Sequence, residues 1–402
     1  MGGVSMEWKE VRLGDVCSIQ RGASPRPIQK FISKEGMPWV KIADATGISS
    51  RYISSTSEYI IKEGVSKSRI VHPGDLIVSN SATPGLPKFM AIEACVHDGW
   101  LIIRDLDGID KVFLYYVFIN IRRRLSNQAN GSVFMNLKTD IVKDFVIKLP
   151  TLEDQLRIAS ILSALDRKIE LNNKINADLE EMAQAIFKNW FVDFEPFKDG
   201  KFVDSELGMI PEGWKVGRLT EIASYMNGLA MQKFPPENNE DSLPVLKIKE
   251  LGQGFCGTDS DRCSCNIKDE CKIHNGDVIF SWSGTLLVDV WCGGDCGLNQ
   301  HLFKVTSKDY PKWFYYYWTK HHLQEFIHIA KDKAVTMGHI KRGHLEEALV
   351  AIPDNDSMDK AHDLFEPILS KMISLRMENS RLSLLRDTLL PRLMSGEIEI
   401  PE

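Results

Sequence analysis

Two stretches of the chain carry apolar side chains at the spacing of a coiled coil. Residues 151–194 contain no Gly or Pro, and seam positions recur there over 28 residues in eight steps, a mean spacing of 3.5. The seam positions are Ile158, Ile161, Leu165, Ile169, Asn172, Asn176, Leu179, Met182 and Ile186. The strong helix formers and the preceding Leu149-Pro150 predict one long helix.

A second seam of equal length lies near the other end of the chain, in residues 358–394. Its positions are Phe365, Ile368, Met372, Leu375, Asn379, Leu382, Leu385, Leu389 and Leu393. Pro367 predicts a kink there or a helix that begins there. Each helix alone would expose an apolar strip, so we expect the two to pack together, antiparallel, with the seam asparagines fixing their register.

The rest of the chain is an internal repeat. Residues 8–16 (WKEVRLGDV) recur as 214–222 (WKVGRLTEI), and residues 71–79 (VHPGDLIVS) recur as 273–281 (IHNGDVIFS). The second motif predicts a Gly-Asp turn that enters a strand. Each half then continues with an aromatic-rich helix and a closing strand: 112–125 and 145–149 in the first half, 313–327 and 349–352 in the second.

The repeat and the seams together predict α/β (α+β) domains in tandem repeat, joined by two long antiparallel coiled-coil helices with pseudo-two-fold symmetry. The first domain is expected at 1–150, the first long helix at 151–194 and a linker at 195–213. The second domain is expected at 214–353, and the second long helix with a tail at 354–402.

Composition is that of an ordinary globular protein, with 402 residues, 43% hydrophobic and 26% charged. No apolar run is long enough to span a membrane, and the first residues, MGGVSMEWKE, do not resemble a signal peptide. We therefore expect a cytoplasmic protein with its eight cysteines reduced. Because net charge is −6, nucleic-acid binding would depend on local grooves and on basic surface from a partner.

Catalytic signatures are missing from the sequence, since neither a phosphate-binding glycine loop nor a methyltransferase motif is present. Six cysteines lie within residues 256–296, at spacings that fit no zinc knuckle. Free thiols are favoured, and a zinc site in this domain stays open as an alternative. His72 and His274 occupy the same place in the two repeats, just before the Gly-Asp turn, which favours a structural hydrogen bond over a catalytic role.

The combination resembles the DNA-specificity subunit of type I restriction–modification systems. The resemblance covers essentially all of the chain and is carried by RLGD (12–15), LPTLEDQ (149–155), MAQAIFKNWF (182–191), IPEGW (210–214) and LRDTLLPRLMSG (385–396). One departure is Asp154, because the family usually has Glu before this Gln.

The resemblance implies a non-catalytic subunit that holds no metal or cofactor itself. Its two domains would recognise a bipartite site in double-stranded DNA, and the helix pair would set the spacer. Partners would be two methyltransferase subunits, which use S-adenosylmethionine, and motor-nuclease restriction subunits, which use Mg²⁺ and ATP, in bacterial or archaeal host defence. The expected docking face for the methyltransferase is Phe187, Trp190 and Phe191.

Two other classes of protein remain as alternatives. One is a DNA methyltransferase or nuclease fused to a dimerisation helix. The other is a coiled-coil adaptor that does not contact DNA.

Base-edge recognition needs amide, hydroxyl or cationic side chains on loops that enter a groove. Candidates in the first domain are Arg21, Ser24, Arg26, Ser79, Ser81, Thr83, Lys88, Asn136 and Lys138. Candidates in the second domain are Asn227, Gln232, Lys233, Ser281, Ser283, Thr285, Thr336, His339 and Lys341. These loops occupy equivalent places in the repeats and differ in sequence, as expected of two domains that recognise different half-sites.

Overall fold

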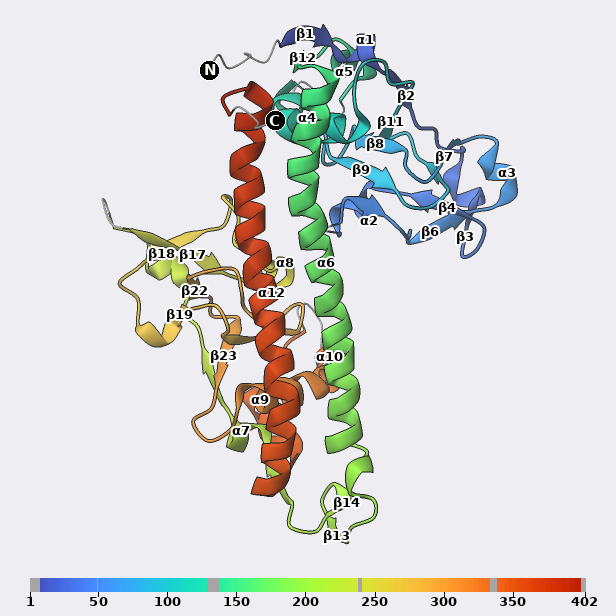
Figure 1. Ribbon diagram of the computed structural model, residues 1–402. Helices are drawn as coiled ribbons and strands as arrows, with labels where there is room; N and C mark the ends of the chain where they lie inside the picture. The colour runs from blue at the N-terminus through green and yellow to red at the C-terminus, as the bar shows by residue number, and fades with distance from the viewer. Residues whose placement is uncertain (1–7, 49, 129–136, 238–240, 333–337, 399–402) are drawn as a thin grey trace. The chain divides into compact units, whose positions relative to one another are not determined.

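The computed structural model describes residues 8–48, 50–128, 137–237, 241–332 and 338–398. The chain divides into two units (Figure 1): unit 1 is Met1–Glu170 with Leu382–Glu402, and unit 2 is Leu171–Arg381. Each unit contains one globular domain and a segment of each of two long helices. In the part of the chain that the structure describes, no helix is both long and apolar enough to cross a membrane.

The domain of unit 1 contains two five-stranded sheets. The first has the order β2 (Ser18–Arg21), β11 (Trp100–Arg104), β8 (Leu76–Ser79), β9 (Pro87–Met90), β5 (Tyr52–Ile53). The second has the order β3 (Ile32–Ser33), β6 (Glu58–Ile60), β4 (Met37–Val40), β10 (Ala94–Val96), β7 (Arg69–Val71).

Side chains alternate across the first sheet of this domain, as strand geometry requires. Leu76 and Val78 of β8 belong to the core formed with helix α4 (Lys111–Gln128). Ile77, between them, belongs to the core formed with Val40 and Val96 of the second sheet. The strand is therefore buried on both faces, which explains its unbroken apolar sequence.

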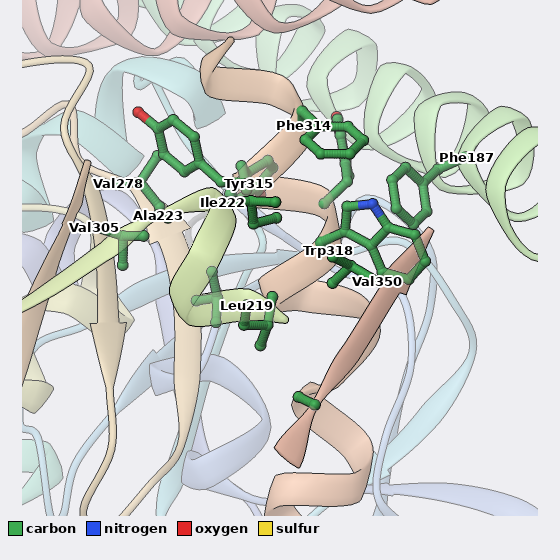
Figure 2. Close-up of a cluster of buried hydrophobic side chains, with 14 of the residues drawn as sticks. Phe187, Leu219, Ile222, Ala223, Val278, Val305, Phe314, Tyr315, Trp318 and Val350 are labelled. Atoms are coloured by element: carbon green, nitrogen blue, oxygen red, sulfur yellow. The ribbon is translucent and has the colours of Figure 1, made fainter. Parts of the chain in front are cut away.

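The domain of unit 2 has the same plan with two four-stranded sheets. The first has the order β16 (Ser224–Asn227), β23 (Leu302–Thr306), β20 (Val278–Ser281), β21 (Leu287–Val290). The second has the order β18 (Arg262–Ser264), β17 (Ser242–Leu246), β22 (Cys296–Leu298), β19 (Lys272–Ile273). Figure 2 shows one face of β20 and β23, where Val278 and Val305 share a core with Tyr315 and Phe314.

The first and last strands of each domain pair with each other and close it. In unit 1, β1 (Lys9–Arg12) pairs antiparallel with β12 (Val146–Leu149). In unit 2, β15 (Lys215–Arg218) pairs antiparallel with β24 (Leu349–Ile352). The strands predicted before Leu149-Pro150 and Ile352-Pro353 are therefore present, and they bring the two ends of each repeat together.

The Gly-Asp turns of the two repeats have the same hydrogen bonds. Asp75 accepts the backbone N–H of His72 at 3.0 Å, and Asp277 accepts that of His274 at 2.9 Å. The Nδ1 atom of each histidine ring lies against a carboxylate, at 2.9 Å in unit 1 and 2.8 Å in unit 2. These contacts give both histidines the structural role expected from the sequence.

The aromatic-rich helix of each repeat packs on the first sheet, but its form differs. Unit 1 has the single helix α4, whereas unit 2 has α9 (Lys312–His321) followed by α10 (Leu323–Asp332). Shorter helices complete the units: α1 (Leu13–Val16), α2 (Ile42–Thr46), α3 (Lys62–Val65), α5 (Thr139–Lys143), α7 (Leu219–Ile222), α8 (Ile248–Gln253) and α11 (Arg342–Glu347).

The two long helices are α6 (Leu152–Phe191), with 40 residues, and α12 (Asn355–Ser395), with 41. The hydroxyl of Thr151 accepts the N–H of Asp154 at 3.2 Å at the start of α6. Helix α12 begins at Asn355, so it does not begin at Pro367, which lies inside it. The alternative expectation, a kink at this proline, stays a prediction. The expected linker 195–213 contains a hairpin, β13 (Phe202–Ser205) and β14 (Gly208–Pro211).

Within unit 2 the segments of α6 and α12 run antiparallel. Asn172 Nδ2 donates to Asn379 Oδ1 at 2.9 Å. Phe187, further along α6, makes an edge-to-face contact with Phe365, which lies earlier on α12. Asn379 Nδ2 donates in turn to Asn173 at 2.8 Å. Such bonds between asparagines of facing helices are satisfied in one register only, which is the role expected of Asn172 and Asn379. The expectation is wrong for Asn176, whose buried amide has no hydrogen-bond partner among the described residues.

Within unit 1 the end of α12 packs on the start of α6. Leu390 and Leu393 share the core with Ile158 and Leu162. Ile158 is buried as expected, but the buried Leu162 and Asp166 are each one residue away from the expected Ile161 and Leu165, which are only partly buried. The reason is that α6 faces the domain as well as α12, so its buried face is rotated toward both.

The remaining seam residues vary in burial. Asn172, Asn176, Met372 and Leu375 are buried. The partly buried members are Ile169, Leu179, Ile186, Ile368, Asn379, Leu382 and Leu389. Met182 and Leu385 are 44% and 47% exposed, so the expectation that they lie in the seam is wrong. The neighbouring residues Ala183 and Arg386 turn inward instead.

Candidate nucleic-acid interface

One carboxylate organises the candidate loop of unit 1. Asp98, in the turn between β10 and β11, accepts the hydroxyl of Ser24 at 2.5 Å and lies 3.3 Å from Arg26 Nη2. Its backbone carbonyl accepts Arg21 Nε at 2.7 Å and Asn80 Nδ2 at 3.1 Å. Three candidates far apart from Asp98 in sequence therefore converge on one turn.

The charge of Asp98 is stabilised by this arrangement. Partial burial raises the pKa of its carboxyl, but the Ser24 hydrogen bond and the Arg26 and Arg21 guanidiniums outweigh it and hold the pKa below the usual range. Both arginines are exposed beyond the carboxylate. They are thus ordered at the surface and remain able to bind a phosphate or a base edge.

Two candidates of unit 1 are not available to a nucleic acid. Ser79 is fully buried, and its hydroxyl accepts the N–H of Leu86 at 2.9 Å. Lys88 is 5% exposed, and its ammonium donates to the backbone carbonyls of Ile48 and Ser50. The assignment of these two side chains to DNA contact is corrected: they stabilise the scaffold beneath the loop. Ser81 and Thr83 are partly buried, and Lys138 is exposed.

Burial makes the Lys88 amine a weaker base than an ordinary lysine. Loss of hydration, followed by repulsion from Arg122, lowers its pKa to about 8. The exposed fraction of the side chain and the two carbonyl contacts agree that this amine points into the protein.

In unit 2 the equivalent loops also meet. Ser283 and His339 form an isolated antiparallel bridge, and Gly284 N–H donates to the carbonyl of Gly338 at 3.0 Å. Thr285, His339 and Lys341 are exposed there. Ser281 and Ser283 are buried, and Ser281 bonds the Ser283 carbonyl at 3.2 Å, so their assignment to DNA contact is corrected as well.

A groove of about 610 Å³ lies beside these loops in unit 2. Its floor includes the buried Met231 and Val245, and its rim includes the exposed Gln232. Three cations and one carboxylate line it: Lys247, Lys249, Arg262 and Asp261. The candidates Asn227 and Lys233 are exposed near the same edge of the domain, on β16 and the turn that follows. Asn136 and Thr336 lie outside the described residues.

Three residues of these surfaces have no place among the sequence candidates: Asp98, Gln300 and His301. Asp98 and Gln300 lie in equivalent turns, just before β11 and β23 respectively, and no sequence motif marks them. The repeat that aligns residues 71–79 with 273–281, at an offset of 202, also aligns Asp98 with Gln300.

The proposed aromatic docking face is wrong for two of its three residues. Phe187 and Phe191 are 3% and 1% exposed, inside the core of unit 2. The ring centroids of Phe187 and Trp318 lie 5.1 Å apart (Figure 2). Trp190 is partly buried against Phe197. These aromatics attach α6 to its domain, which is why the sequence concentrates them at the end of this helix.

The cysteines of unit 2 do not gather into a ligand set. Cys263, Cys271, Cys292 and Cys296 are buried, and Cys256 is partly buried. A hydrogen bond with Cys296 lowers the pKa of Cys256. Across the described ranges, no group of three or more His, Cys, Asp or Glu side chains is placed to hold a metal ion.

Comparison with known proteins gives one family. The family model described as the type I restriction modification DNA specificity domain matches residues 6–181 and again 211–368. The chain is 28% identical to the type I restriction enzyme MjaIX specificity subunit of Methanocaldococcus jannaschii, over 100% of this chain and 96% of the relative. It is 22% identical to the HindI specificity subunit of Haemophilus influenzae, over 98% and 100%.

A solved structure has the same fold. The crystal structure of the type I restriction–modification S subunit from M. genitalium aligns with a TM-score of 0.54 and 15% identity, over 97% of both chains. The two matches of the family model coincide with the two repeats that the fold contains. The chain therefore belongs to the specificity subunits of type I restriction–modification systems, which recognise DNA through two tandem domains and are not themselves catalytic.

Proposed function

We propose that the chain recognises a bipartite DNA sequence, one half-site with each domain. The observation that carries this is the equivalence of the two domains: the Gly-Asp turns keep the same hydrogen bonds, while the surface loops around Asp98 and Gln300 differ. One scaffold with two different surfaces fits a site made of two unlike halves, on the logic of paired DNA-binding modules.

The long helices are proposed to set the spacer between the half-sites. At about 1.5 Å per residue, a helix of 40 residues is roughly 60 Å long. The Asn172–Asn379 hydrogen bond and its neighbour support a fixed register, and a fixed register gives a fixed length. Inserting seven residues into each helix, after Asn173 in α6 and before Glu378 in α12, keeps the seam in phase. We expect the insertion to lengthen the spacer between the two half-sites of the methylated motif.

The catalytic steps are proposed to belong to partners that act with this chain in the cytoplasm of a bacterial or archaeal host. Two methyltransferase subunits would supply S-adenosylmethionine chemistry, and restriction subunits would supply Mg²⁺- and ATP-dependent DNA translocation and cleavage. The net charge of −6 supports this division, because a chain with more acidic than basic side chains gains DNA affinity from basic surface that a partner adds.

The test is to express the chain with and without its methyltransferase in a host without other adenine methylation, and to sequence modified bases. We expect a bipartite, asymmetric motif with a fixed spacer only when both proteins are present. Methylation by the chain alone would instead favour the enzyme alternative. A methyltransferase whose specificity is unaffected by the chain would favour the adaptor alternative.

A further inference from the structure

The turn before β11 in unit 1 and the turn before β23 in unit 2 occupy the same place, since each strand is second in the order of its first sheet. In unit 1 the turn His97–Gly99 precedes β11, and Trp100 N–H donates to the carbonyl of His97 at 3.1 Å. In unit 2 the turn 299–301 precedes β23, and Leu302 N–H donates to the carbonyl of Asn299 at 3.0 Å. The duplicated scaffold therefore presents two turns with one backbone geometry.

A glycine fixes each turn against the end of a neighbouring strand. A Cβ atom at Gly22 would lie 2.2 Å from the carbonyl oxygen of His97, and one at Gly228 would lie 2.3 Å from that of Asn299. Only glycine permits so close an approach. The two turns are thus held tightly, so side chains at their tips are presented from rigid positions.

The tips of the turns carry different chemistry. In unit 1 the tip is Asp98, which binds Arg21 and Arg26 and so acts through them. In unit 2 the tip is Gln300, a partly buried amide at the groove, with His301 Nε2 3.3 Å from its Nε2. Among the described residues, no Lys or Arg side chain hydrogen-bonds to this amide, which lines the same groove as Gln232.

We propose that Gln300 is a specificity-determining residue of unit 2 and contacts the edge of an A·T base pair. The proposal rests on the DNA-recognition function above. A glutamine amide offers one donor and one acceptor side by side, which matches N7 and N6 of adenine in the major groove. The neighbouring Lys247 and Lys249 are paired with the exposed Asp261 and Asp259, contacts weak enough to exchange for phosphates.

In unit 1 the residue at the tip of the turn, Asp98, acts on DNA through the arginines that it holds. Asp98 is a positioning residue, because its carboxylate and carbonyl hold Arg21 and Arg26 at the surface. A guanidinium is the usual partner of guanine O6 and N7. The same turn therefore supplies base contact itself in one domain and supports it in the other.

The experiment uses the full chain with its methyltransferase and compares the methylated motifs of Gln300→Ala, Gln300→Glu and the wild type. For Gln300→Ala we expect discrimination at one A·T position of one half-site to fall about tenfold or more. Gln300→Glu keeps an acceptor and loses the donor, so preference at that position should move toward a G·C pair, whose cytosine N4 donates. Gln253→Ala, on an exposed glutamine of unit 2 outside the groove, is the control and should leave the motif unchanged.

The outcomes separate this inference from the function on which it rests. If the wild type gives no bipartite motif, the proposed function fails first. If the wild type does and both Gln300 variants keep its discrimination at every position, the assignment of Gln300 is overturned. Relaxation in both half-sites at once would overturn it too, because it would indicate a general loss of binding.

Discussion

The contact between domain and long helix is made differently in the two units, although the elements correspond. In unit 1, Tyr116 of α4 donates to Asp166 of α6 at 2.5 Å, and Arg386 of α12 binds the other oxygen at 2.7 Å. Arg51 of the domain adds a two-pronged bond to Glu170, at 2.9 Å for both contacts. Two carboxylates of α6 thus gather a hydroxyl and two guanidiniums at the junction.

In unit 2 the same junction is aromatic. Tyr317 of α9 corresponds to Tyr116 of α4. Asp166 lies fourteen residues after the start of α6, and the residue at the same place in α12 is Leu369, which offers no side-chain acceptor. The buried Tyr317 hydroxyl therefore has no hydrogen-bond partner in the part of the chain described. Rings pack there instead, among them Phe365, which stacks on Trp313 with centroids 4.7 Å apart.

The ion pair between domain and long helix has opposite polarity in the two units: the helix supplies the acid in unit 1 and the cation in unit 2. Lys88 of β9 and Asp289 of β21 occupy the same place, next to the central strand of each first sheet. In unit 1 the helix supplies the acid, Glu170, and the domain supplies cations. In unit 2 the helix supplies the cation, Arg376, which binds Asp289 at 2.7 Å. Each domain is thereby complementary in charge to its own helix segment.

The largest expected effect tests the aromatic junction. Phe365 is fully buried, so Phe365→Ala should cost about 4 kcal/mol of unfolding free energy, through lost transfer energy and a cavity. Chemical denaturation followed by tryptophan fluorescence measures it, since Trp313 and Trp318 lie in the same core. Leu364→Ala, at a neighbouring position that is 41% exposed, is the control and should change stability by less than about 0.5 kcal/mol.

The ionic junction is tested by Asp166→Ala. This change leaves Arg386, Arg51 and the Tyr116 hydroxyl without their shared acceptor, and breaking a buried pair costs about 3 kcal/mol. Glu153→Ala is the control, because its carboxylate is 74% exposed and forms only a helix-surface pair. A loss below about 1 kcal/mol for Asp166→Ala would contradict the view that this junction is held by charge.

The reversal of sign is tested by a double-mutant cycle. Arg376→Glu and Asp289→Lys should each destabilise the chain by about 2 kcal/mol, because each places like charges together. The double variant restores attraction with the polarity of unit 1 and should recover at least half of the summed loss. Arg381→Glu, at an exposed position of α12, serves as the control. Additive losses in the cycle would mean that the sign of this pair does not matter.

The sequence predicts best those structural features that occur in both repeats. The Gly-Asp turns and the closing strands follow from residues present twice at nearly equal offsets, and the asparagine register follows from polar residues within an apolar seam. Met182 and Leu385 were misplaced by one residue, because a seam count treats a helix as facing one partner, whereas each long helix here faces two. Asp98 and Gln300 were missed, because a turn residue becomes notable only when its neighbours in space are known.

The buried candidates show a second limit. Ser79, Ser281 and Lys88 are polar and flank loops, which is why they were expected at the surface. Backbone carbonyls and amides of the loops need partners inside the protein, and these side chains satisfy them. Residue type alone does not distinguish a loop's internal support from its exposed face.

The pH dependence of stability tests the environment of Lys88. Its pKa in the folded state, about 8, is below that of an unfolded lysine, so the unfolded chain binds more protons between those values and stability rises with pH across that window. After a discount for solvent screening, the gain from pH 7 to 9.5 is about 1–2 kcal/mol. Lys88→Met should abolish this part of the pH profile, measured as the difference from the wild type at each pH. Equal profiles for the two proteins would place the ammonium in water.

The smallest effects compare the two tyrosines directly. Tyr116→Phe removes a hydrogen bond to a buried carboxylate and should cost about 1.5 kcal/mol. Tyr317→Phe removes a buried hydroxyl that has no hydrogen-bond partner within the described ranges, so it should leave stability unchanged or raise it by about 0.5 kcal/mol. The Leu369→Asp variant tests whether the missing acceptor is the cause. In a protein that carries Leu369→Asp, adding Tyr317→Phe should become destabilising, as Tyr116→Phe is in unit 1. If Tyr317→Phe instead costs as much as Tyr116→Phe, the hydroxyl has a partner in solution, and the two junctions are more alike than their packing indicates.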